Sequence, residues 1–65
     1  MITTRVKARM ATDKLVDAMD ISVTTVNGVV ELSGTAKSKA EAEQAVAIAR
    51  GVDHVKSVKS EIQVK

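Results

Sequence analysis

The fold is decided by the stretch Ile21-Ser22-Val23-Thr24-Thr25-Val26-Asn27-Gly28-Val29-Val30-Glu31-Leu32-Ser33-Gly34, in which two runs of strand-forming residues flank an Asn-Gly pair. Asn-Gly is the strongest short-range signal for a β-hairpin, because a type I′ turn requires a positive φ at both central residues. Glycine adopts that conformation without steric cost and asparagine tolerates it. The stretch therefore predicts strands over 21–26 and 29–34, joined by a two-residue loop.

The two-residue loop also predicts the register of the hairpin, with Val26 opposite Val29 and Val23 opposite Leu32. Because side chains alternate between the faces of a strand, this register assigns one face to the core. The predicted core face carries Ile21, Val23, Thr25, Val30 and Leu32, and the solvated face carries Ser22, Thr24, Glu31 and Ser33. Val26 and Val29 fall on the polar face at the tip. They form either a stabilising cross-strand pair or a small apolar contact surface.

A first helix is predicted over 2–11, because Ile2, Val6 and Met10 recur with helical spacing on one face. A straight continuation would place Asp13 and Asp17 on the same stripe. We therefore expect a break near Thr12-Asp13, with Asp13 as the N-cap of a short second turn that runs through Asp17. The alternative is one continuous helix to about Ala18.

A second helix follows Ser38-Lys39-Ala40-Glu41, which has the pattern of a capping box. In that motif the Ser38 hydroxyl accepts from the Glu41 N–H, and the Glu41 carboxylate accepts from the Ser38 N–H. Gly51 is expected to end the helix in the left-handed conformation, just after Arg50 in the last turn. The apolar stripe of this helix consists of small side chains, which allow close packing on a sheet: Ala42, Ala45, Val46 and Ala49.

A third strand is predicted over 55–64, where Val58, Ser60, Ile62 and Val64 alternate with charged or polar residues. The resulting order is α-β-β-α-β. It predicts an α+β fold of two layers, with two helices packed on one face of a three-stranded sheet. Sixty-five residues predict a single domain over 1–65, whose core must come from aliphatic side chains because the chain has no aromatic residue.

The composition contains no pattern that points to a reaction. Cysteine is absent, and His54 is the only histidine, so catalysis or metal binding at His54 would lack partner residues. We therefore expect no enzyme activity and no cofactor. No apolar run approaches the roughly 18 residues that span a bilayer. The first residues do not resemble a signal peptide, which fits either a cytoplasmic protein or a domain of a longer exported protein.

Basic residues form two groups in a chain of net charge +2. These groups are Arg5, Lys7, Arg9 and Lys14 near the first helix, and Lys56, Lys59 and Lys65 along the last strand. They indicate either contact with anionic headgroups or an acidic partner, or an ordinary solvated surface. A nucleic-acid binder of the KH type would need a G-x-x-G loop, and single-strand platforms need stacking aromatics. Both features are missing, so we expect no nucleic-acid binding.

The order of these motifs resembles the BON domain family. The resemblance rests first on the run Ile21-x-Val23-x-x-x-Asn27-Gly28-Val29-Val30-x-Leu32-x-Gly34. The helix pattern Thr3-x-x-Val6-Lys7-x-x-Met10 precedes it. The Ser38-x-x-Glu41 helix start and the passage Gly51-Val52-x-x-Val55-x-x-Val58 follow it. The similarity covers essentially the whole chain.

The resemblance implies a bacterial, non-enzymatic module of the periplasm or cell envelope that associates with phospholipid membranes or with other envelope components. One member of the family is an osmotically induced periplasmic protein, so the resemblance also implies a link to osmotic stress. The predicted contact residues are Arg5, Arg9, Val26, Val29, Lys56 and Lys59. The expected partner is an anionic phospholipid surface or an envelope protein, bound by a monomer. The alternative is a protein-interaction or structural module without lipid binding.

Overall fold

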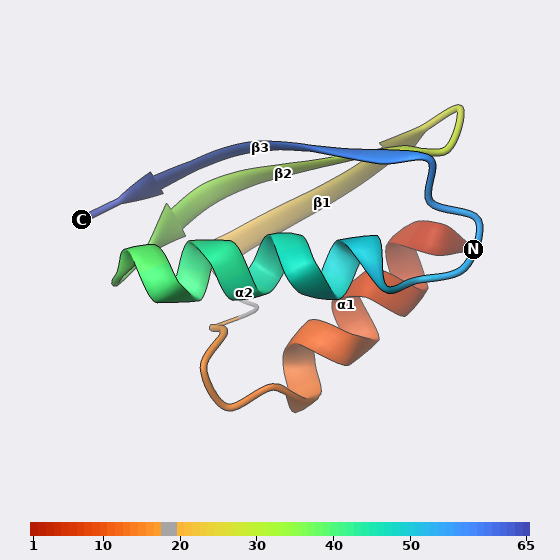
Figure 1. The fold of residues 1–65 in the computed structure, drawn as a ribbon. Helices are drawn as coiled ribbons and strands as arrows, with labels where there is room; N and C mark the ends of the chain where they lie inside the picture. The colour runs from red at the N-terminus through yellow and green to blue at the C-terminus, as the bar shows by residue number, and fades with distance from the viewer. Residues whose placement is uncertain (18–19) are drawn as a thin grey trace.

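The computed structural model describes residues 1–17 and 20–65, and these residues form two helices beneath a three-stranded sheet (Figure 1). Both helices lie on the same face of the sheet, as the α+β expectation requires. The elements follow the predicted order α-β-β-α-β: α1 (Ile2–Thr12), β1 (Ile21–Val26), β2 (Val29–Ala36), α2 (Lys39–Arg50) and β3 (Ser57–Val64).

The hairpin of β1 and β2 confirms the predicted register. Val26 pairs with Val29, and the antiparallel pairing runs back to Ile21 opposite Gly34. Asn27 has φ 51° and Gly28 has φ 83°, the two positive values that a type I′ turn needs. Strand β2 continues to Ala36, two residues beyond its expected end. Because of this added length, every residue of β3 has a pairing partner in β2.

Strand β3 lies parallel to β2, at the edge of a mixed sheet of order β1-β2-β3. Its register places Val58 beside Val30 and Val64 beside Ala36. The strand begins at Ser57, two residues later than predicted, because the loop after α2 still contains a turn in which the Val55 N–H donates to the Val52 carbonyl. Helix α2 thus makes the crossover that two parallel strands require.

The core lies between the sheet and the two helices. Its largest fully buried side chains are Met10 and Val6 of α1 and Leu32 and Val30 of β2. Ala45 and Ala49 of α2 are fully buried against them, which confirms that α2 uses small side chains to lie close to the sheet. Aliphatic side chains thus fill the core of a chain that lacks aromatic residues.

Helix α1 ends at Thr12, which confirms the predicted break, but the role assigned to Asp13 is wrong. Asp13 is the C-cap of α1 with extended backbone, and its carboxylate accepts a hydrogen bond from the Leu15 N–H at 2.9 Å. This side-chain turn competes with helix formation. Residues 14–17 consequently form no second helical turn. Ala18, the end of the alternative continuous helix, lies outside the described residues, but that helix is already excluded at Asp13.

The capping box at the start of α2 is only half formed. The Ser38 hydroxyl accepts from the Glu41 N–H at 3.2 Å, as predicted. The Glu41 carboxylate does not return to Ser38; its two oxygens accept from the backbone N–H groups of Lys37 (3.0 Å) and Asp17 (3.1 Å). The loop that follows α1 packs against the start of α2 and brings the Asp17 N–H within reach of the carboxylate.

The predicted left-handed glycine at the end of α2 is also wrong. Gly51 has φ −80° and ψ −5°, a right-handed conformation, and its N–H donates to the Ala47 and Ile48 carbonyls. The chain keeps turning in the same sense, because the Val52 N–H donates to the Ala49 carbonyl. The residue with a positive φ in this loop is His54, at 72°.

Candidate contact surface at the hairpin tip

The hairpin tip presents the apolar pair Val26 and Val29 on the sheet face that the helices leave open. Their pairing ends the ladder of β1 and β2, one residue before the turn on each side. Val26 is 51% exposed and Val29 is half-buried. The neighbours of this pair along the same face are polar, so the tip is the place where apolar side chains reach solvent from the open face.

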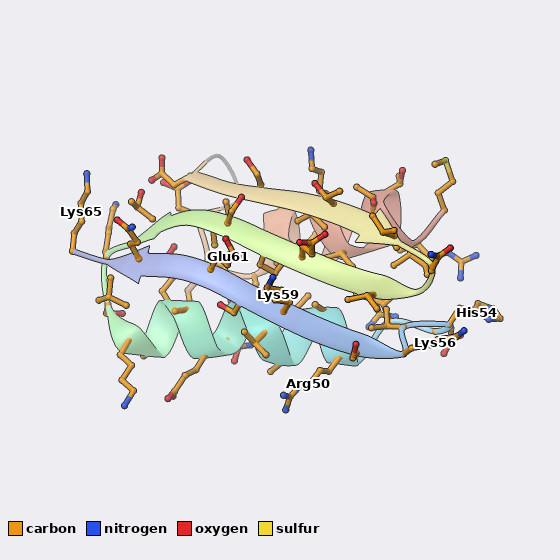
Figure 2. The ribbon with its side chains drawn as sticks, turned by 90° about the horizontal axis from the view of Figure 1, so that it is seen from above. Arg50, His54, Lys56, Lys59, Glu61 and Lys65 are labelled. Atoms are coloured by element: carbon orange, nitrogen blue, oxygen red, sulfur yellow. The ribbon has the colours of Figure 1, made fainter. Side chains whose placement is uncertain are left out.

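Lys56 lies directly beside the turn. Its backbone N–H donates to the Gly28 carbonyl at 2.8 Å, just before β3 joins the sheet. The aliphatic part of its side chain runs along the turn, so that a Cβ added at Gly28 would lie 3.0 Å from Lys56 Cγ. His54 is exposed at the same end of the molecule (Figure 2). Lys56 therefore adds a cation to the apolar tip.

The first turn of α1 lies under the same end of the hairpin. The hydroxyls of Thr3 and Thr25 are 2.7 Å apart, and Thr25 is next to Val26 in β1. Figure 1 shows the N-terminus at the end where the hairpin turns and β3 begins. Arg5 is one helical turn from Met1, because its N–H donates to the Met1 carbonyl. The exposed Met1 belongs to this end too, and no pattern in the sequence indicates that.

The remaining two predicted contact residues lie elsewhere. Arg9 is in the last turn of α1, one turn beyond Arg5. Lys59 is in the middle stretch of β3 on the open face, where its ammonium is 3.3 Å from the Glu61 carboxylate and its register partner is Glu31. The structure therefore brings Val26, Val29 and Lys56 together with the turn that carries Arg5. It does not join Arg9 and Lys59 to them.

In residues 1–17 and 20–65, no three histidine or acidic side chains come close enough together to hold a metal ion. No helix in that part of the chain combines the length and hydropathy needed to cross a bilayer. At the far end of α1 from the tip, hydrogen bonds from the Gln44 side chain and the Leu15 N–H lower the pKa of Asp13. These two hydrogen bonds account for the shift of the Asp13 pKa without a functional role.

The described residues define a small two-layer α+β domain with an exposed apolar hairpin tip. The chain belongs to the BON domain family, whose model matches residues 1–65 and confirms the resemblance seen in the sequence. It is 43% identical over 63 residues to osmotically-inducible protein Y of Escherichia coli (strain K12), a match that covers 97% of this chain and 31% of that protein. It is also 36% identical over 64 residues to an uncharacterised protein from the gshII 5′ region of Anaplasma centrale, covering 98% and 42%. The chain thus spans less than half the length of each relative.

Proposed function

We propose that this chain is a non-enzymatic binding module of the bacterial envelope, one domain over 1–65, which attaches peripherally to anionic phospholipid surfaces through its hairpin end. The observation that carries the proposal is the meeting of three separate segments at that end. The tip supplies Val26 and Val29, the start of β3 supplies Lys56, and the first turn of α1 supplies Arg5. An apolar tip with Lys56 beside it and Arg5 at the same end of the molecule suits the boundary between headgroups and acyl chains.

The expected strength follows from the groups involved. Each Lys or Arg near an anionic leaflet contributes about 1 kcal/mol. Burying the exposed half of the Val26 side chain adds about 1 kcal/mol. Arg5, Lys56 and Val26 together then give a free energy of binding on the order of 3 kcal/mol, which corresponds to a dissociation constant of roughly 6 mM. The module would therefore bind only strongly anionic membranes, and would release as salt screens the cations.

One relative supports a link to osmotic stress, and membership of the BON domain family supports a place in the envelope. The Escherichia coli relative is named for its induction by osmotic conditions. A salt-sensitive contact with lipid would respond directly to such conditions, since the electrostatic part of the attraction falls as ionic strength rises. We therefore assign this chain to the periplasmic side of the envelope as part of the same proposal.

Co-sedimentation with vesicles tests the proposal. Phosphatidylglycerol vesicles at about 0.02 M salt should carry the chain down, whereas phosphatidylcholine vesicles, or about 0.3 M salt, should not. Lys56→Gln should weaken binding about fivefold, which corresponds to the loss of one headgroup contact. Lys65→Gln removes the same charge at the opposite end of β3 (Figure 2) and should have little effect. Absence of sedimentation with anionic vesicles at low salt contradicts the proposal.

Protein interaction is the second candidate function. It is favoured by a groove between α2 and β3, lined largely by apolar atoms, which is separate from the hairpin tip. That surface and the tip do not share a residue, so the two functions are compatible and can be tested independently.

A further inference from the structure

The outer edge of β3 is the open edge of the sheet that lies over α2. Among the described residues β3 pairs with β2 alone, so its outward backbone N–H and C=O groups have no strand partner. Such an edge is a ready template for another extended chain. Strand β3 is eight residues long, which is enough to hold a peptide of comparable length.

A groove runs along this edge between β3 and α2. Ser60 is the strand residue that lines it, and it occupies the face on which its neighbours Val58 and Ile62 carry large apolar side chains. The small side chain of Ser60 leaves a hollow above α2. The helix lines the hollow with one stripe spaced three and four residues apart: Glu43, Val46, Ala47 and Arg50, with Ala42 beside it.

The position of helix α2 limits which kind of partner can pair with the edge of β3. In Figure 2 it lies beneath and beyond β3, so that its outer side forms a ledge past the edge of the sheet. A second copy that paired its own β3 with this edge would bring a second α2 into the same space. A single extended segment avoids this collision, because it occupies only the strip between the edge and the ledge.

The charges beside the hollow indicate which side chains the segment carries. Lys59 and Glu61 flank Ser60 on the open face, about 60% exposed and paired with each other at 3.3 Å. In an antiparallel ladder, directly opposite residues share a face. A residue opposite Ser60 therefore points into the groove, while its two neighbours meet Glu61 and Lys59 on the open face.

We propose that the β3 edge and the α2 ledge bind an extended peptide segment of a partner protein by antiparallel strand addition. The segment carries a branched apolar residue opposite Ser60, with a basic residue before it opposite Glu61 and an acidic residue after it opposite Lys59. Main-chain hydrogen bonds to the edge hold the segment, and the hollow over Ala42 and Val46 selects the apolar side chain. The hairpin tip takes no part, so this interaction is independent of lipid binding.

The test is an amide NMR titration of the whole chain with the synthetic peptide acetyl-Thr-Val-Lys-Leu-Glu-Val-Thr-amide at up to about 1 mM. Saturable shifts are expected along β3 and at Val46 and Ala47. A control peptide with Lys and Glu exchanged places like charges opposite Lys59 and Glu61, and it should bind at least fivefold more weakly. The double variant Lys59→Glu/Glu61→Lys should prefer the control peptide instead.

A second variant separates loss of binding from loss of folding. Ser60→Leu fills the hollow with the chain's own side chain, so the folded state should be at least as stable as the wild type while peptide affinity falls at least tenfold. Three results would each overturn the proposal. These are shifts that leave β3 unaffected at the highest peptide concentration, equal binding of the two peptides, and unchanged affinity in Ser60→Leu.

Discussion

The buried carboxylate of Glu41 accepts a hydrogen bond from the backbone N–H of Asp17, 24 residues earlier in the chain. Its other oxygen accepts from the Lys37 N–H, and the residue is only 3% exposed. One side chain thereby ties the loop after α1 to the entrance of α2. A charged acceptor that satisfies two backbone donors in a buried position is costly to remove, because the donors lose their partner and do not regain full hydration.

We expect Glu41→Gln to lower the free energy of unfolding by about 2 kcal/mol, since the amide can accept from one N–H but turns its own NH₂ toward the other. Urea denaturation followed by circular dichroism measures this loss. Glu43→Gln, a matched change on the exposed side of the same helix, should stay within about 0.5 kcal/mol of the wild type. Equal effects of the two substitutions would show that the Glu41 bridge contributes nothing specific.

Gly34 and Gly51 should respond to alanine with opposite signs. Gly34 has φ 120°, and a Cβ there would lie 2.1 Å from the Asp20 carbonyl oxygen, so Gly34→Ala forces the backbone apart. We expect a loss of about 3 kcal/mol or more, close to the whole stability of so small a domain.

Gly51 has an ordinary right-handed conformation, and its added Cβ would stay at least 3.5 Å from the neighbouring atoms other than its own chain neighbours. Gly51→Ala should therefore raise the free energy of unfolding by about 0.4–1 kcal/mol, because alanine has less freedom in the unfolded chain. Thermal unfolding of the two variants beside the wild type checks both signs. If Gly51→Ala instead lowered the free energy of unfolding, this would favour the left-handed conformation that the structure excludes at Gly51.

Asp13 should make stability depend on pH at the acid end. The Gln44 side-chain amide, donating to Asp13 Oδ2 at 2.9 Å, and the Leu15 N–H lower the pKa of Asp13 below its ordinary value of 3.8. A carboxyl group with a lower pKa in the folded state favours folding while ionised. This contribution is complete above about pH 4 and is lost as the pH falls through the folded value.

Carboxyl carbon NMR should therefore place the Asp13 midpoint below 3.8 in the wild type and closer to 3.8 in Gln44→Ala. The stability difference between these two chains should be present at neutral pH and should vanish in strong acid. An Asp13 midpoint at or above 3.8 in the wild type would contradict the hydrogen bonds described at the end of α1.

Val26→Thr should separate the apolar part of vesicle binding from the electrostatic part. Threonine has nearly the shape of valine and suits a strand, so the hairpin is retained. The apolar contact is lost, and binding to phosphatidylglycerol vesicles should fall about threefold, with the salt dependence unchanged. Lys56→Gln should instead reduce the salt dependence. Vesicle binding of both variants across a salt series distinguishes the apolar from the electrostatic contribution. If Val26→Thr binds as well as the wild type, the hairpin tip does not contact lipid.

Short sequence patterns were enough to predict much of the fold. Asn27-Gly28 determined the turn, the register and the inward-facing residues, because the backbone conformation of a two-residue loop leaves only one alternation of faces. The break after Thr12 also followed from the sequence, since no straight helix buries both Met10 and the residues after Asp13. Those features depend on neighbours within a few residues, so propensity and periodicity were sufficient to predict them.

A long-range contact explains the wrong prediction at Glu41, and local turns explain those at Asp13 and Gly51. Glu41 matched a capping box, but a backbone donor at Asp17 and another at Lys37 captured its carboxylate. Gly51 matched a left-handed cap, but the Val52 N–H donates to the Ala49 carbonyl, and the chain continues to turn in the right-handed sense. In each case the local motif was one of several low-energy choices, and a different set of hydrogen bonds formed.

The sequence by itself determined the hairpin, the two helices, the order of elements and the family, because each depends on short patterns whose physics is local. Only the tertiary structure decided that β3 pairs parallel to β2 at the sheet edge, and that this pairing brings Lys56 to the turn at Gly28. It also decided that Arg9 and Lys59 lie apart from the tip. Strand order and the distances between surface residues depend on how separate segments pack together. The spacing of residues along one segment does not predict that packing.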